Sequence, residues 1–382
     1  MKIKLEGSTN NLTEKKDILD FSAAAARVCY SEKDFDTLVK EDKKKLIEGT
    51  LKSGHHSVYD HVHLNFYIDG IPKIGAMILN NERDYTTSEK SARYTQMEPV
   101  LHQKELYNKW MTILEKKIGA KYGKKLDELK IKKLAQENAR YMTSVFTPTK
   151  MVHTLSFRQL NYIMHYFEEF IENSVENSKF YEGVKDFMSE FNEILKSFYV
   201  DNLRSRNDRH LSFFAKRKDF KEEFGENYST NYNVSFACLA QLHRHRTISY
   251  EMRLIGDDEL QGFFMPEIFN GDEKITEEWN KDMCSVADYD YPQGMLINIH
   301  ESGKYADFIT KMHERLCGHA QWEIMDQTKK TLDEYIKAAK DNNEAVYNEL
   351  VDYANGPRCT FPNIECRGSP CAFGKKSLER LI

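Results

Sequence analysis

A short basic segment, Gln241–Glu251 with the sequence QLHRHRTISYE, constrains the fold more than any other stretch of this chain. It follows the apolar run Val234–Leu239, which is typical of a buried strand or of the end of a helix. Arg244, His245 and Arg246 then stand side by side. Neighbouring cations repel one another, and they cannot be buried without an anion or a hydrogen-bond partner. The segment is therefore either a solvated basic turn or a clamp for phosphate, because Arg forks contact phosphate oxygens at two points and His adds a titratable donor.

The first half of the chain repeats this theme. The apolar run Ile74–Leu79 leads into the polar run Asn80–Tyr94, which contains Glu89, Ser91 and Arg93. In an extended segment these alternate side chains face the same way. They form either a group that grips a polar ligand or an ordinary hydrophilic loop.

Three charged or titratable residues follow one another at helical spacing near the C-terminal end. Arg315, His319 and Glu323 are spaced i, i+4 and i+8, so in a helix that begins near Arg315 they share one face. This face is either a ladder of surface ion pairs or an anion site at the start of the helix.

Arg140 and Arg158 flank a largely apolar stretch. An arginine among buried neighbours needs a counter-charge. An internal carboxylate or a bound phosphate would serve equally well, and the sequence leaves both open.

Two clusters raise the question of a metal. His55, His56, Asp60 and His61 form one, but carboxylate–imidazole pairs are also typical of hydrogen-bonded structure. Cys359, Cys366 and Cys371 form the other, and their spacing lacks the tight CxxC pair of zinc sites. We assign no metal site. The glycine-rich loops GxGxxG and GxxxxGK[ST] are also absent from the sequence.

Composition excludes several classes of protein. With 40% hydrophobic and 12% aromatic residues, the 382-residue chain can fill a sizeable core. Its net charge of −5 argues against a dedicated nucleic-acid binder. The N-terminal segment MKIKLEGSTNN lacks the apolar core of a signal peptide, and no apolar run is long enough to span a membrane. With seven cysteines, an odd number, we expect a cytoplasmic protein with reduced thiols and no membrane partner.

We expect four segments along the chain. Residues 1–200 form an N-terminal unit, and the charged stretch 201–226 connects it to a second unit at 227–350. The tail 351–382 contains the clustered cysteines. Lysine-rich amphipathic helices are expected over about 104–137 and another amphipathic helix over 180–200.

Together these motifs resemble the flavin-dependent thymidylate synthases. That family has the signature RHRxxSxNExSxRY, an upstream GHxSxxEH segment and a downstream helix like HAQWEIR. The corresponding segments here are GHHSVYDH (54–61), SEKSARY (88–94), ARYMTS and SFRQL around Arg140 and Arg158, QLHRHRTIS (241–249) and RLCGHAQWEI (315–324). The signature is divided between the halves. The first has Asn81–Arg83 in place of RHR, and the second has Met252 and Leu254 in place of Glu and Ser.

The resemblance implies an α/β fold of two tandem synthase-like units, each a mixed sheet flanked by helices, produced by duplication and fusion. In the family, active sites are assembled from several subunits of a tetramer. A fused chain would then form a homodimer that mimics the tetramer.

The resemblance also implies the chemistry. The expected reaction is FAD-dependent C5-methylation of dUMP to dTMP, with methylenetetrahydrofolate and NADPH as co-substrates and no cysteine nucleophile. The alternatives are methylation or hydroxymethylation of another uridylate such as UMP, and a non-catalytic nucleotide- or flavin-binding relative. The expected catalytic residues are Arg244, Glu89, Ser91 and Arg315. The expected substrate-binding residues are Gln241, Arg244, Glu89, Ser91, Arg93, Arg140 and Arg315. The expected FAD-binding residues are His55, Arg158, Arg244, His245, Arg246 and His319.

Overall fold

The chain forms two compact units, and both are discontinuous in sequence. The computed structural model describes residues 1–95, 97–174, 178–205, 210–215, 221–253, 262–366 and 371–382. The first unit comprises residues 1–90 and 148–212, and the second comprises 91–147 and 213–382. The boundaries expected from the sequence follow chain order, whereas residues 91–147 pack with the C-terminal half of the chain.

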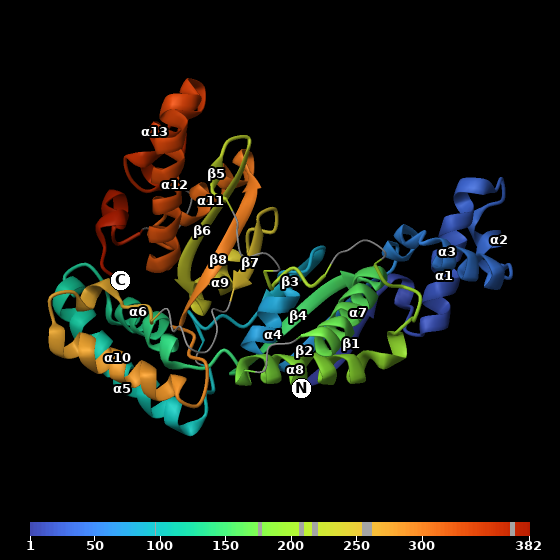
Figure 1. The fold of residues 1–382 in the computed structure, drawn as a ribbon, viewed down its shortest axis with the longest axis horizontal. Helices are drawn as coiled ribbons and strands as arrows, with labels where there is room; N and C mark the ends of the chain where they lie inside the picture. Colours follow the sequence, from blue (N-terminus) through green and yellow to red (C-terminus); the bar gives the residue numbers. More distant parts are fainter. Residues whose placement is uncertain (96, 175–177, 206–209, 216–220, 254–261, 367–370) are drawn as a thin grey trace. The chain divides into compact units, whose positions relative to one another are not determined.

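The first unit is built on a four-stranded sheet in the order β1-β2-β4-β3. Its strands are β1 (Lys2–Ser8), β2 (His63–Pro72), β3 (Tyr85–Glu89) and β4 (Pro148–Ser156). Its helices are α1 (Lys15–Arg27), α2 (Phe35–Lys40), α3 (Lys44–Ser53), α4 (Lys73–Leu79), α7 (Phe157–Asn173) and α8 (Lys179–Leu195). In Figure 1, α7 and α8 run beside the sheet. α4 approaches α8 so closely that a Cβ on Gly75 would lie 2.7 Å from the Phe187 ring.

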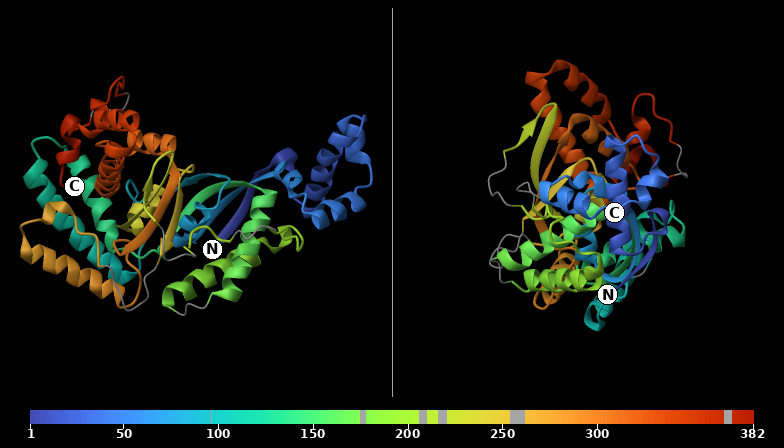
Figure 2. Two further views of the ribbon diagram at one scale, coloured as in Figure 1. Left: turned by 45° about the horizontal axis from the view of Figure 1, so that its top comes forward. Right: turned by 90° about the vertical axis from the view of Figure 1, so that its right-hand side faces the viewer.

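The second unit contains the other four-stranded sheet, in the order β5-β6-β8-β7. Its strands are β5 (Glu223–Phe224), β6 (Asn227–Ser235), β7 (Ser249–Arg253) and β8 (Leu296–Lys304). Its helices are α5 (Leu101–Tyr122), α6 (Glu128–Ala139), α9 (Phe236–Leu242), α10 (Glu273–Ala287), α11 (Tyr305–Arg315), α12 (Trp322–Asn342) and α13 (Glu344–Ala354). Figure 2 shows α5, α6 and α10 grouped as one helical layer of this unit.

The expectation of mixed sheets is wrong, because every pairing between the named strands is antiparallel. β2 and β3 do run in the same direction, but β4 lies between them and runs the opposite way. Helix α4, which leads from β2 toward β3, has only seven residues.

The two sheets share one topology and one register. In each unit a strand leads into a seven-residue helix, a turn and a five-residue strand, and a later nine-residue strand inserts between the two. Glu89 pairs with Met151, the fourth residue of β4, and Met252 pairs with Ile299, the fourth residue of β8. The strand register therefore gives Met252 the position that Glu89 has in the first unit, as the motif comparison expects. Leu254, the other residue in that comparison, lies outside the described residues.

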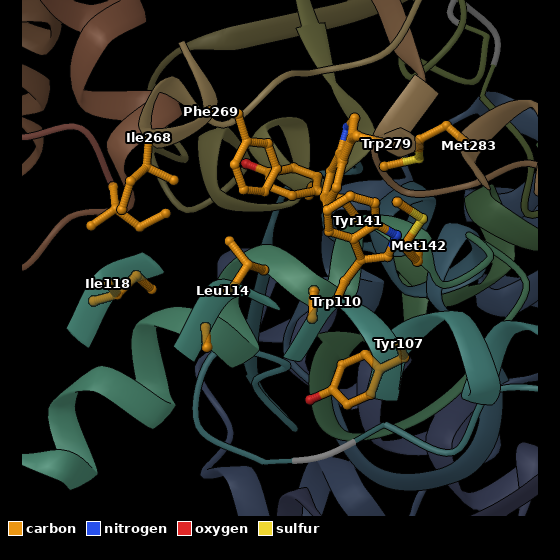
Figure 3. Packing of buried hydrophobic residues seen from close by; sticks show 14 of the residues in the cluster. Tyr107, Trp110, Leu114, Ile118, Tyr141, Met142, Ile268, Phe269, Trp279 and Met283 are labelled. Atoms are coloured by element: carbon orange, nitrogen blue, oxygen red, sulfur yellow. The ribbon is translucent and has the colours of Figure 1, made fainter. Parts of the chain in front are cut away.

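An aromatic cluster forms the core between the helices of the second unit (Figure 3). The rings of Trp110 and Trp279 meet edge to face with centroids 4.7 Å apart. Both indole N–H groups have acceptors: Trp110 Nε1 donates to Asp282 Oδ2 at 2.8 Å, and Trp279 Nε1 donates to the Phe264 carbonyl at 2.9 Å. These contacts explain why α5 and α6 belong with the C-terminal half of the chain. The lysine-rich helices are amphipathic, as expected, and no described helix is both long and apolar enough to cross a membrane.

Candidate functional site

The basic segment forms the turn between α9 and β7 in the second unit. Helix α9 begins after Ser235, whose Oγ accepts a hydrogen bond from the Cys238 N–H at 3.0 Å, as a serine N-cap does. After the helix ends at Leu242, the next residues turn toward β7, so neighbouring side chains point in different directions. His245 is buried, whereas Arg244 and Arg246 are exposed. The turn thus separates its three basic side chains, with Arg244 and Arg246 at the surface and His245 inside.

His245 binds the arginine of a motif that lies far away in sequence. The Arg315 Nε–H donates to His245 Nε2 at 2.6 Å, and Arg315 Nη2 donates to the Gln241 carbonyl at 3.4 Å. Burial and the positive charges of Arg315 and Lys311 lower the pKa of His245 to about 2. The imidazole is therefore neutral at physiological pH and accepts through Nε2, so its proton is on Nδ1, which lies 3.9 Å from Glu314 Oε2.

The expectation of one continuous helix carrying Arg315, His319 and Glu323 is wrong. Helix α11 ends at Arg315, α12 begins at Trp322, and Leu316 has non-helical backbone angles. The C-terminal tail stabilises the intervening turn by bonding to its carbonyls. The Arg358 N–H donates to the Leu316 carbonyl at 2.6 Å, and the Arg380 guanidinium donates to the carbonyls of Gly318 and Ala320. Arg315 therefore stands at the C-terminal end of a helix, where a cation is favoured.

Gln321, which the sequence analysis did not single out, connects two of the expected substrate-binding residues. Its Oε1 accepts hydrogen bonds from Arg140 Nη2 and from Gln241 Nε2, and its Nε2 donates to the Tyr141 hydroxyl. Tyr141 in turn donates to Glu323 Oε2 at 2.8 Å. Gln321 and Tyr141 each stand next to a motif residue, and a polar side chain inside an apolar stretch is the signal that could have identified them.

Glu323 anchors this network to the start of α9. Its carboxylate accepts from the Ser235 N–H at 2.7 Å and from the Ser235 hydroxyl at 2.6 Å. Burial raises the pKa of Glu323, although these hydrogen bonds act in the opposite direction. Burial likewise raises the pKa of Tyr141 well above its usual value, with the nearby Glu323 charge adding to the effect. Tyr141 therefore remains a hydroxyl donor over the whole pH range in which the protein can be handled.

No carboxylate in the described part of the chain forms an ion pair with Arg140. It is 4% exposed and forms no ion pair with a described residue, and burial lowers its pKa. Its Nε–H has no hydrogen-bond partner among the described residues, and the same holds for Gln241 Oε1. A buried donor and a buried acceptor thus remain unsatisfied within one hydrogen-bonded group, which is costly unless a ligand or water pairs with them.

Arg158, in contrast, pairs with an internal carboxylate of the first unit. Its Nη2 lies 2.6 Å from Asp60 Oδ2, and the Ser156 hydroxyl donates to the other carboxylate oxygen at 2.6 Å. Arg158 and His55 both line a cavity of about 650 Å³ in this unit. The other lining residues are Gly54, His56, Ser57, Asp60, His63, Arg83, Asp84, Ser156, Gln159, Tyr162 and Ser205.

The expected alternation of Glu89, Ser91 and Arg93 does not hold, because β3 ends at Glu89. Residues after Lys90 form a turn in which the Tyr94 N–H donates to the Ser91 carbonyl at 3.1 Å. Glu89 belongs to the first unit, whereas Ser91 and Arg93 belong to the second. The three side chains therefore do not form one extended face.

Glu89 is buried beside a lysine. Lys73 Nζ lies 2.5 Å from Glu89 Oε1, and the Glu89 side chain is 2% exposed. The Asn80 amide donates to the other carboxylate oxygen at 3.4 Å.

Arg93 connects α6 to the turn that carries His319. Its Nε–H donates to Glu137 Oε2, and its Nη2 donates to the His319 carbonyl at 2.8 Å. Burial alone would lower the pKa of Arg93, but the Glu137 carboxylate outweighs that effect and the net shift is upward. The His319 side chain itself is exposed.

Neither of the two clusters considered as metal sites forms a set of metal ligands among the described residues. His56 Nδ1 lies 3.0 Å from the Tyr162 hydroxyl, and Asp60 is occupied by Arg158 and Ser156. In the part of the chain that the structure describes, no three His, Cys, Asp or Glu side chains are placed to hold a metal ion.

Comparison with known proteins connects the chain to one family. Residues 11–176 match the family model described as thymidylate synthase complementing protein. This match includes His55, Glu89, Ser91, Arg93, Arg140 and Arg158, and it does not extend to the basic turn or to His319.

Two relatives are named flavin-dependent thymidylate synthase. The one from Pyrococcus furiosus is 24% identical over 145 residues, which is 35% of this chain and 57% of the relative. The one from Pseudothermotoga lettingae is 29% identical over 153 residues, which is 37% of this chain and 67% of the relative. The chain thus spans between about half and two thirds of the length of these relatives.

Two solved structures also align with the chain. Thymidylate synthase X from Helicobacter pylori, crystallised with FAD and dUMP, has a TM-score of 0.32 at 19% identity and covers 53% of this chain and 95% of its own. A UMP/dUMP methylase from Streptomyces cacaoi, bound to 5-Br dUMP, has a TM-score of 0.32 at 16% identity and covers 52% and 94%. Scores this low carry no argument about the site of the present chain.

Proposed function

We propose that this chain is a divergent member of the flavin-dependent thymidylate synthase family, and that it binds FAD and methylates C5 of dUMP. The product is dTMP, and methylenetetrahydrofolate and NADPH are the co-substrates. The observation that supports this most is the meeting of two separate motifs in the second unit. Arg315 of RLCGHAQWEI donates to His245 of QLHRHRTIS, and Gln321 accepts from Gln241.

The side chains present fit a flavin dinucleotide and a nucleotide. The first-unit cavity of about 650 Å³ has the size of a cofactor site, and it is lined by His55 and Arg158, which match the family's flavin-binding positions. In the second unit, Arg244 and Arg246 are exposed and His245 is held by Arg315. Exposed guanidinium groups are suited to phosphate oxygens. When bound, FAD supplies the hydride that completes the methyl group, after its reduction by NADPH.

The protein's own residues would orient the substrate and stabilise charge. Uracil C5 becomes nucleophilic when negative charge developing on the ring is stabilised, and Arg140 and Arg315 are the guanidinium groups proposed for that role. The unsatisfied Nε–H of Arg140 and Oε1 of Gln241 would then pair with polar groups of the nucleotide. Glu89, Ser91 and Arg93 are proposed to hold its sugar and phosphate, and His319 to line the flavin. Arg244 is proposed to contact both ligands.

We also propose that the chain arose by duplication and fusion and that it works as a homodimer. The shared strand order and register of the two units support the duplication. The losses are complementary: the first unit keeps Glu89 but lacks RHR, and the second keeps RHR but has Met252 at the equivalent position. Simple decay of one copy would not sort the losses in this way, whereas a dimer that rebuilds a four-unit assembly would keep complete sites.

Two measurements test the proposed activity. The purified protein should absorb in the flavin bands, and with dUMP, NADPH and methylenetetrahydrofolate it should release the C5 proton of the nucleotide. A colourless protein that also fails to take up added FAD would refute the proposal.

The alternatives have their own tests. Release of the C5 proton from UMP in preference to dUMP would indicate another uridylate as substrate. The replacement of the family glutamate by Met252 is the feature that favours a non-catalytic relative. That reading would gain support if Arg244→Ala left both flavin binding and turnover intact.

A further inference from the structure

The second unit contains a smaller pocket whose lining includes Arg93 and His319, which the proposed function assigns to the nucleotide and the flavin. It has a volume of about 150 Å³ and lies where α6, the turn after β3, the Gly318–Ala320 turn and the C-terminal segment meet. The lining includes four residues with fixed positive charge, Arg93, Lys130, Lys133 and Arg380, and one carboxylate, Glu137.

Two of these four cations have a carboxylate partner of their own. Arg93 pairs with Glu137, and Lys130 Nζ lies 3.1 Å from Asp127 Oδ2 at the surface. Lys133 has no ion pair with a described residue, and its Nζ lies 6.0 Å from the centre of the Tyr94 ring. Lys133 and Arg380 therefore contribute two positive charges that no carboxylate of the described chain is bound to.

Arg380 is the unusual member of the group. Its guanidinium is buried, with 4% of the residue exposed, and its two terminal nitrogens donate to the carbonyls of Gly318 and Ala320. Its Nε–H is buried and has no hydrogen-bond partner in the described part of the chain. A buried guanidinium without an anion carries a desolvation cost, which agrees with the lowered pKa of Arg380. A bound anion would supply the missing charge.

We propose that this pocket, formed by the C-terminal segment and α6, binds the phosphate group of a small phosphorylated molecule. A phosphate monoester carries close to two negative charges and three acceptor oxygens. That charge matches Lys133 and Arg380, and the oxygens can accept from the lysine ammonium. The volume suits the phosphate end of a ligand, while Tyr94, 60% exposed, and Phe373 offer rings beside it for a base or sugar.

Substitution of Lys133 tests the site without disturbing the fold, because this side chain is exposed on α6. Its neighbour Lys132 is also exposed on α6 but does not line the pocket, so Lys132→Ala is a matched control for net charge and helix propensity. Binding of inorganic phosphate, of dUMP and of deoxyuridine is measured by titration calorimetry for the wild type and both variants. We expect Lys133→Ala to weaken phosphate and dUMP binding about tenfold, and Lys132→Ala and deoxyuridine binding to be unaffected.

Competition identifies the source of the phosphate. If inorganic phosphate displaces dUMP, the pocket holds the phosphate of the substrate; if both bind together, it serves a separate phosphorylated ligand. Equal phosphate and dUMP affinities in Lys133→Ala and Lys132→Ala would overturn the inference. Arg380→Gln gives a second reading, with far-UV circular dichroism to verify folding, and should weaken phosphate binding at least as much. None of these measurements needs flavin or turnover, so the site can stand or fall independently of the proposed reaction.

Discussion

The imidazole of His245 accepts a hydrogen bond from the Arg315 guanidinium at 2.6 Å. This bond requires a neutral histidine, because a protonated Nε2 could not accept it. It also joins the turn after α9 to the end of α11, so that two motifs separated by 70 residues act as one piece of structure. A histidine in a run of cations is thus used here as an acceptor.

Acid should destabilise the protein partly through His245. Burial lowers its pKa from 6.5 to about 2 in the folded state, so between these values the unfolded state binds more protons and stability falls as the pH falls. His245→Gln keeps an acceptor for Arg315 and removes the titration. We expect the wild type to lose about 2 kcal/mol more than the variant between pH 7 and pH 5 in urea unfolding. Equal losses would contradict the buried neutral state; His153, whose pKa is lowered to about 4, titrates with the same sign in both proteins.

Removal of the Tyr141 hydroxyl should destabilise the second unit. This hydroxyl donates to Glu323 and accepts from Gln321, so Tyr141→Phe leaves the buried Gln321 Nε2 without its acceptor and removes one of the two hydrogen bonds that Glu323 Oε2 accepts. We expect a loss of about 1–3 kcal/mol in the free energy of unfolding. Tyr289→Phe, at a side chain that is 80% exposed, is the control and should change nothing measurable. A variant at 141 as stable as this control would mean that water or repacking replaces the hydroxyl.

A buried ion pair makes Lys311 critical for folding. Lys311 and Glu301 are both fully buried, with Nζ 2.6 Å from Oε2, and the hydroxyl groups of Tyr228 and Tyr232 also donate to this carboxylate. Lys311→Met should cost about 3–5 kcal/mol, because it leaves Glu301 charged and buried.

The double substitution Lys311→Met with Glu301→Gln separates the charge effect from the loss of packing and should recover part of that stability. The surface pair Lys329–Asp333 is the contrast, and Lys329→Met should cost less than about 1 kcal/mol. If the double variant is no more stable than Lys311→Met, the cost does not come from an unpaired carboxylate.

Arg244 should matter for turnover and not for stability. Its side chain is exposed on the turn after α9, so Arg244→Ala should leave the unfolding free energy within about 0.5 kcal/mol of the wild type. Under the proposed function, the rate of C5 proton release should fall about a hundredfold, because a guanidinium that stabilises developing charge is lost. Lys340→Ala, which removes an exposed charge near the end of α12, should affect neither quantity. An equal fall in rate for both variants would point to net charge rather than to the site.

Local patterns determined much of this protein in advance. Apolar periodicity predicts the amphipathic helices over 104–137 and 180–200, and Gly54 ends α3 in the left-handed conformation that favours glycine. The motif comparison also assigns Met252 to the position in the second half that Glu89 has in the first, and the strand register agrees. These features depend on neighbours within a few residues, or on one strand pairing.

Only the tertiary structure decided which residues meet. Helical spacing predicts one helix through Arg315 and Glu323. In the structure, a turn separates α11 from α12, and the tail residues Arg358 and Arg380 donate hydrogen bonds to the carbonyls of this turn. Arg158 pairs with a carboxylate and Arg140 does not, although in the sequence both flank the same largely apolar stretch. The reason is that a buried polar group takes its partners from distant segments, and no local sequence pattern specifies which segment will pack against it. For the basic turn, the sequence left both a solvated turn and a phosphate clamp open, and the fold assigned His245 to Arg315.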